Sequence, residues 1–203
     1  MTKRKKNAAR QSASKSTEEV ERLAKTMQGE SDRGCLLVSL AEIDNYLKEI
    51  LLLYLGKGGA HKDAEFLLNS GAESPIATVN VRTRLARCLG LITPELTNVI
   101  DAIRAIRNDQ AHGTADFEIT DRVIAKVLDS WSDSSRQNLF DIARGIKRPN
   151  KPRLKLTLSV GWVLMGLSAA VYRMENSVVR IDFTPPPRKT IIHKPRAAKQ
   201  GSH

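Results

Sequence analysis

A long apolar helix pattern is the feature that most constrains how this chain folds. Between residues 33 and 55, apolar side chains recur every three or four positions, and polar side chains occupy the other faces. The recurring positions are Leu36, Leu37, Leu40, Ile43, Leu47, Ile50, Leu51 and Tyr54. This spacing is typical of an amphipathic helix, and Gly56, Gly58 and Gly59 predict where it ends. A helix this apolar needs neighbours on several sides, so the pattern predicts the central helix of a bundle.

The rest of the chain also favours helices. Further helix patterns begin after Ser16, cover residues 62–68, 79–89, 94–111 and 134–144, and open at Thr120. Thr93-Pro94-Glu95 is the clearest helix start, because Thr caps, Pro suits the first turn and Glu complements the dipole. Aromatic residues make up only 4% of the chain, against 41% apolar residues, which argues against a β-sandwich. The sequence therefore predicts an all-α bundle of about six to seven helices.

The last apolar segment, about residues 154–174, permits more than one interpretation. Residues 156–172 carry no charge, which reaches the lower length limit of a membrane span. Its first residues, Leu154, Leu156 and Leu158, alternate as in a strand. Polar and glycine residues within it weaken membrane insertion. We expect a buried helix of a soluble, cytoplasmic protein without a membrane contact, since the first residues also lack a secretory signal pattern.

The net charge of +11 lies entirely at the two ends of the chain. Residues 1–16 and 185–203 contain Lys and Arg but no acid, whereas residues 17–184 hold equal numbers of basic and acidic residues. We predict a disordered basic tail over residues 1–16, one helical domain over 17–183 and a Pro-rich basic tail over 184–203. Within the domain, the basic C-terminal third either docks on the acidic part or extends a basic surface.

Clustered cations predict contacts with nucleic acid, because Lys and Arg displace the counterions of phosphates. Solubility alone is the simpler explanation, and an anionic membrane surface is a weaker third one. A basic connector broken by prolines, residues 147–153, adds to the two tails. The candidate nucleic-acid-binding residues are Lys3, Arg4, Lys5, Lys6, Lys147, Arg148, Lys151, Arg153, Arg188 and Lys189.

No cofactor or metal motif is visible in the sequence. The chain lacks a Walker loop, a dinucleotide fingerprint, an HExxH helix and a GxSxG elbow. Cys35 and Cys88 lie far apart in apolar helix patterns, so both are expected to be buried thiols. A helix-turn-helix formed by residues 79–89 and the next helix stays open, although helix pairs occur in any bundle.

Arg107 stands out in the helix that follows Thr93. On a helical wheel it falls beside Ile100 and Ile103, within the apolar arc. A guanidinium there needs an acid, free carbonyls, a second subunit or a bound phosphate. One interpretation is structural, with Arg107 bridged to an acid and His112 capping the helix end. The other is a phosphate site in which His112 acts as general acid or base.

Residues of about 33–131 resemble the mannitol operon repressor family of bacterial regulators. The matching segments are the helix Leu36–Leu55, Pro75-Ile76, Arg82–Leu91, Asp101–Asn108, Ala111-His112 and Phe117. The Arg-Asn-x-x-x-His string also resembles the signature of the HEPN superfamily, helical proteins that include metal-independent ribonucleases. The resemblance implies an all-α, dimeric protein, and for a ribonuclease it implies Arg107, Asn108 and His112 as catalytic residues. Gln110 departs from the pattern, since relatives often have an aromatic residue there.

Two functions are therefore expected from the sequence. The first is a non-enzymatic cytoplasmic regulator that forms a homodimer and contacts nucleic acid or an acidic partner protein, without a cofactor. The alternative is a HEPN-type endoribonuclease that needs no metal and uses Arg107, Asn108 and His112.

Overall fold

The computed structural model describes residues 18, 21–57, 59–69, 74–111, 117–146 and 151–176. These residues form helices joined by turns, without a strand among them, which confirms the all-α prediction. The labelled helices are α2 (Asp32–Leu55), α3 (His61–Leu68), α4 (Val79–Cys88), α5 (Pro94–Ala111), α6 (Asp121–Leu128), α7 (Asp133–Gly145) and α8 (Lys151–Asn176). Another helical segment covers residues 21–29. The predicted tails over residues 1–16 and 184–203 lie outside the described residues.

Hydroxyl side chains begin several of these helices. Thr93 Oγ1 accepts a hydrogen bond from Leu96 N at 3.2 Å, and the Thr120 side chain accepts one from Val123 N. Ser31, Thr78 and Ser132 cap α2, α4 and α7 in the same way. Each hydroxyl satisfies one of the N–H groups that a helix leaves without a partner in its first turn. The helix starts predicted at Thr93 and Thr120 are thus confirmed.

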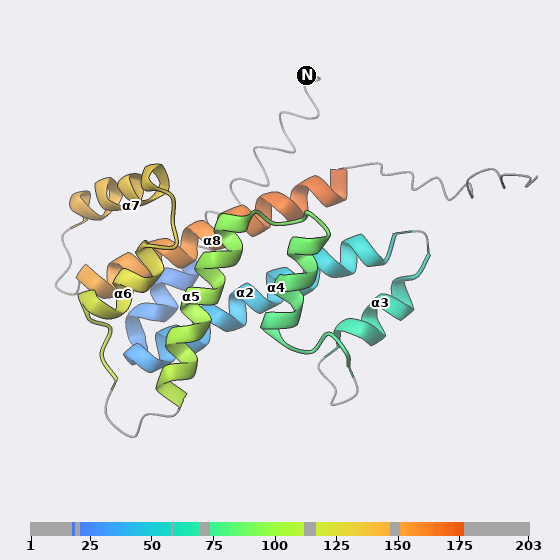
Figure 1. Cartoon of the computed structure of the whole chain (residues 1–203), viewed down its shortest axis with the longest axis horizontal. Helices are drawn as coiled ribbons and strands as arrows, with labels where there is room; N and C mark the ends of the chain where they lie inside the picture. Colours follow the sequence, from blue (N-terminus) through green and yellow to red (C-terminus); the bar gives the residue numbers. More distant parts are fainter. Residues whose placement is uncertain are drawn as a thin grey trace, which may run out of the picture.

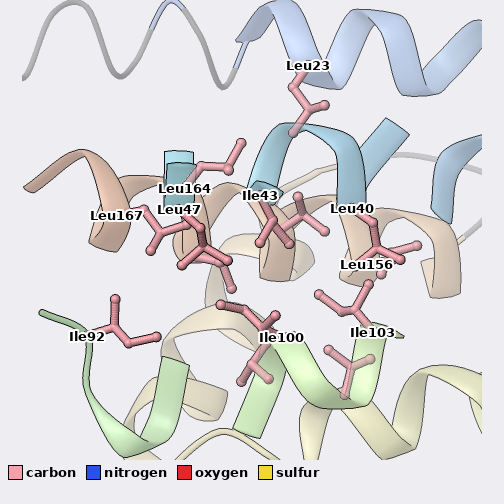
Figure 2. Packing of buried hydrophobic residues seen from close by; sticks show 14 of the residues in the cluster. Leu23, Leu40, Ile43, Leu47, Ile92, Ile100, Ile103, Leu156, Leu164 and Leu167 are labelled. Carbon is pink, nitrogen blue, oxygen red and sulfur yellow. The ribbon is translucent and has the colours of Figure 1, made fainter. Parts of the chain in front are cut away.

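Two long apolar helices, α2 and α8, form the centre of the bundle. Figure 1 shows α8 running alongside α2, and α8 also packs on α5, α6 and α7. Helices α3, α4 and α5 pack on α2 as well, so the predicted central helix is confirmed. Figure 2 shows the buried leucines and isoleucines that meet there: Leu40, Ile43 and Leu47 of α2, Ile100 and Ile103 of α5, and Leu156, Leu164 and Leu167 of α8.

The last apolar segment, residues 154–174, is helical over its whole length and belongs to α8. Its buried residues Leu156, Val160, Val163 and Leu167 follow one another at helical spacing, so the strand-like start of the segment is misleading. Helix α8 is long and apolar enough to cross a membrane, but 56% of its most apolar window is buried inside the bundle. Its role in the described structure is therefore that of a core helix.

Helix α8 begins at Lys151, earlier than the sequence predicted. Lys151, Pro152 and Arg153 belong to its first turn instead of the connector, and proline is well tolerated there because its missing N–H needs no partner. Arg153 Nη1 pairs with Asp32 Oδ1 at 3.2 Å, and Lys155 Nζ pairs with Asp121 Oδ1 at 2.8 Å. At these two positions the basic C-terminal third docks on the acidic part of the chain.

Candidate functional site

Arg107 is exposed, although the helical wheel places it within the apolar arc of α5. Val99, Ile100, Ile103 and Ile106 of the same helix are buried as predicted. The last turn of α5, however, borders a surface hollow that it shares with Arg33, Leu36 and Leu37 of α2. The guanidinium therefore reaches solvent, and burial does not force a partner on it.

The structure brings two of the three signature residues together. Arg107 Nη1 donates a hydrogen bond to Asn108 Oδ1 at 3.3 Å, and both side chains are exposed. Within the described part of the chain, Arg107 has no acidic partner, so the predicted bridge to an acid is not found there. His112 lies outside the described residues, and its proposed roles stay predictions.

Two adjoining hollows form what we call the α2–α5 groove. Their volumes are about 510 Å³ and 120 Å³, and Leu37 and Arg107 line both. The groove is lined by Arg33, Leu36, Leu37, Leu40, Ala41 and Asp44 of α2, by Thr78, Val79 and Asn80 at the start of α4, and by Arg104, Arg107, Asn108, Gln110 and Ala111 of α5. The signature pair Arg107 and Asn108 thus lies in a depression of the surface.

The charge of Asp44, the one acid in the described lining of this groove, is matched from inside the protein. Its Oδ2 accepts a hydrogen bond from Nη1 of Arg82, whose side chain is only 2% exposed. Arg82 also donates from Nε to Ile76 O at 3.0 Å and from Nη2 to Leu68 O at 2.7 Å. Among the residues that the structure describes, the buried arginine is therefore Arg82. Sequence reasoning missed it because its buried neighbours Thr83 and Ala86 form no recognisable apolar stripe.

A second acid beside the groove is shared between two arginines. Asp101 Oδ1 pairs with Arg104 Nη2 at 3.3 Å, and Asp101 Oδ2 pairs with Arg84 Nη2 at 2.6 Å. One carboxylate cannot neutralise two guanidinium groups, so this cluster keeps one positive charge in excess. Arg104 Nε makes no hydrogen bond with any described residue. With Arg107, the groove has a positive potential that Asp44 does not cancel.

An exposed leucine lies between these charges. Leu37 belongs to the apolar repeat that predicted the central helix, yet this residue is 48% exposed. The prediction of a core position is wrong here because the groove leaves this face of α2 without a covering helix. The groove therefore combines apolar surface with arginines and amides.

Two of the predicted nucleic-acid-binding residues, Lys151 and Arg153, are among those that the structure describes. Lys3, Arg4, Lys5, Lys6, Lys147, Arg148, Arg188 and Lys189 lie outside the described residues. Lys151 borders another hollow of about 380 Å³ between α7 and α8. Arg153 makes hydrogen bonds within the protein, because it donates to Asp32 and to the carbonyl oxygens of Met27 and Glu30.

The two cysteines differ in exposure. Cys35 is buried, and its thiol donates to Met27 O at 3.1 Å. Burial raises the pKa of this thiol, and the nearby Arg153 charge opposes the rise. Cys88 is exposed, so the prediction of a second buried thiol is wrong. The described residues contain no group of three or more side chains suited to hold a metal ion.

The fold of this chain matches that of a protein of known structure. No protein-family model and no curated protein matches the sequence. The structure is nevertheless that of an all-α bundle with the MtlR fold, as the resemblance to the mannitol operon repressor family implied. The match is with the X-ray structure of the MtlR–HPr complex from Escherichia coli, at a TM-score of 0.57 and 20% identity. It covers 75% of this chain and 98% of that chain, and at this identity it establishes the fold.

Proposed function

We propose that this chain is a non-enzymatic regulator that acts by binding a partner protein. The observation that carries the proposal is the structural match over 98% of a chain that was solved in a complex with HPr. The α2–α5 groove supports it, because an exposed leucine beside arginines is a surface composition suited to protein contacts. HPr is accordingly the first partner to test.

We further propose that the regulator is a cytoplasmic homodimer and that its cationic ends contact nucleic acid. The sequence supports this second contact, because all of the excess positive charge lies in residues 1–16 and 185–203. Such contacts supply affinity and salt dependence, while sequence specificity requires base contacts from elsewhere.

Calorimetric titration of the purified chain with Escherichia coli HPr tests the partner proposal. Saturable binding supports it, and the absence of binding contradicts HPr as the partner.

Size measurement in solution tests the dimer. Salt-sensitive binding of DNA or RNA that disappears when residues 1–16 and 185–203 are deleted supports the role of the ends. Unchanged binding after this deletion contradicts that role.

A metal-independent endoribonuclease is the second candidate function. The exposure of Arg107 and Asn108, side by side and joined by a hydrogen bond, favours it, because a phosphate site needs accessible donors. Arg107 would bind phosphate, Asn108 would position the substrate and His112 would transfer protons. Incubation of the protein with RNA and a chelator tests this function. Cleavage that His112→Ala abolishes would establish it, and intact RNA would exclude it.

A further inference from the structure

We propose that the α2–α5 groove binds an acidic peptide segment that inserts a leucine-like side chain. The inference rests on the proposed function, since it assumes a protein partner, and it adds the place of the contact and the chemistry of the partner. Neither follows from the likeness to MtlR, which establishes the fold.

The positive charge of the groove indicates that the bound segment is acidic. Asp44, the acid in the described lining, is already paired with buried Arg82, so it offers little repulsion to an incoming carboxylate. Arg104 shares its acidic partner with Arg84, and Arg107 has only the amide of Asn108. Two guanidinium groups thus keep donors for carboxylates, which they bind with good geometry.

The exposed Leu37 indicates that the bound segment also contributes an apolar side chain. Leu37 is 48% exposed and lines both hollows, so it lies where the two hollows meet. Leu40 and Ala41 extend the apolar surface into the larger hollow, whose volume of about 510 Å³ exceeds that of one aliphatic side chain. Covering Leu37 with a second aliphatic side chain removes apolar surface from water, which favours binding.

The lining fits a peptide better than a nucleic acid strand. The residues described in the groove include no aromatic side chain on which a base can stack. An exposed leucine at the centre of the groove gains nothing from a phosphate. A carboxylate beside an aliphatic side chain matches both kinds of surface present here.

The experiment measures the fluorescence anisotropy of a labelled synthetic peptide, Glu-Glu-Leu-Glu-Glu-Leu-Glu-Glu, upon addition of the full-length chain. Peptides with Gln in place of Glu, or with Ala in place of Leu, test the two required features. The groove variants are Leu37→Ala and Arg107→Glu. Their matched controls are Met165→Ala, with 47% exposure against 48% for Leu37, and Arg122→Glu, an exposed position in the first turn of α6.

We expect each groove variant to weaken binding of the acidic peptide roughly tenfold, as losing a central contact does. Both control variants should bind like the unchanged chain, and both altered peptides should bind more weakly. Equal affinities for groove and control variants would overturn the proposal, because they would place the contact on the cationic ends. Displacement of the peptide by single-stranded RNA that itself needs Arg107 would also overturn it.

Titration with HPr separates this inference from the proposed function. If HPr binds the chain and the acidic peptide does not, the groove proposal is overturned while the partner-binding function stands. If the peptide binds in the groove and HPr does not bind, the groove proposal is supported and HPr is excluded as the partner.

Discussion

The buried guanidinium of Arg82 donates a hydrogen bond to the Asp44 carboxylate, so one ion pair joins α4 to α2 beneath the groove. Arg82 also donates from Nη2 to the carbonyl oxygen of Leu68, the last residue of α3, and from Nε to that of Ile76, which lies between α3 and α4. A single side chain therefore fixes three separate segments of the chain around one position.

Asp44→Ala should destabilise the protein because it leaves the Arg82 charge buried without a carboxylate. We expect a loss of roughly 2–3 kcal/mol in the free energy of unfolding, measured with urea. Asp109→Ala is the matched control, since Asp109 pairs with Lys126 where both side chains are 61% exposed. Its cost should stay under about 1 kcal/mol. Equal losses in the two variants would show that the buried pair contributes no more than a surface pair.

Arg153→Ala should loosen the helical segment at residues 21–29. Arg153 holds the carbonyl oxygens of Met27 and Glu30 at the end of this segment and also pairs with Asp32. Hydrogen exchange should become faster at residues 21–29 and stay unchanged in α5. Arg144→Ala, at a side chain that is 75% exposed, serves as the control. Unaltered exchange in the Arg153 variant would contradict this anchoring role.

Gly166 lets α8 approach α5 closely. A Cβ atom there would lie 2.9 Å from Leu96 Cδ1, so a small side chain requires only that the end of Leu96 shifts. A larger one should not fit, and Gly166→Leu should cost about 1–3 kcal/mol of stability. Gly145→Leu is the control, because no atom lies within 4 Å of a Cβ built at that position. The control should change stability by no more than about 0.5 kcal/mol.

Glu95 should make stability depend on pH. Its partial burial favours the neutral form, but hydrogen bonds from the Ser132 N–H and from the Ser132 and Ser135 hydroxyls outweigh this and lower its pKa. The ionised form therefore stabilises the fold above the ordinary pKa of 4.5, and this contribution is lost as the pH falls through the lower folded value. The stability difference between the unchanged chain and Glu95→Gln should shrink on acidification. A difference independent of pH would contradict this.

The two thiols should differ in reactivity. Exposed Cys88 should react with a disulfide reagent in the native protein, whereas buried Cys35, whose thiol pKa is raised by burial, should react only after unfolding. Cys88→Ser should then abolish the native reaction. Rapid modification of Cys35 under native conditions would mean that the contact between α2 and the preceding helical segment opens readily.

Helical periodicity was sufficient to predict the bundle and its centre, because the apolar spacing of α2 and α5 records which faces are buried. It was insufficient for Arg107, since a helical wheel describes one helix and says nothing of how far its neighbour extends. Arg82 was missed for the complementary reason: its burial depends on the distant partners Asp44 and Leu68, and a local pattern carries no trace of either.

The candidate groove was not predictable as a surface. Arg107 and Asn108 drew attention through a short signature, and Leu37 was assigned to the core. Their common position arises only when α2 and α5 pack on each other and leave a hollow between Leu37 and the last turn of α5. Exposure of this kind is a property of the assembled fold and not of a residue's own sequence neighbourhood.

The pairing of α2 with α8 has a consequence for how the protein is made. Helix α2 begins at residue 32, and α8, which covers much of its apolar face, begins at residue 151. A ribosome synthesises the chain from its N-terminus, so α2 leaves the exit tunnel long before its main partner exists. During that interval α3, α4 and α5 can already pack on α2, but the leucines and isoleucines that α8 buries in the finished protein lack that cover. The nascent chain must then avoid aggregation or rely on a chaperone until the last long helix arrives.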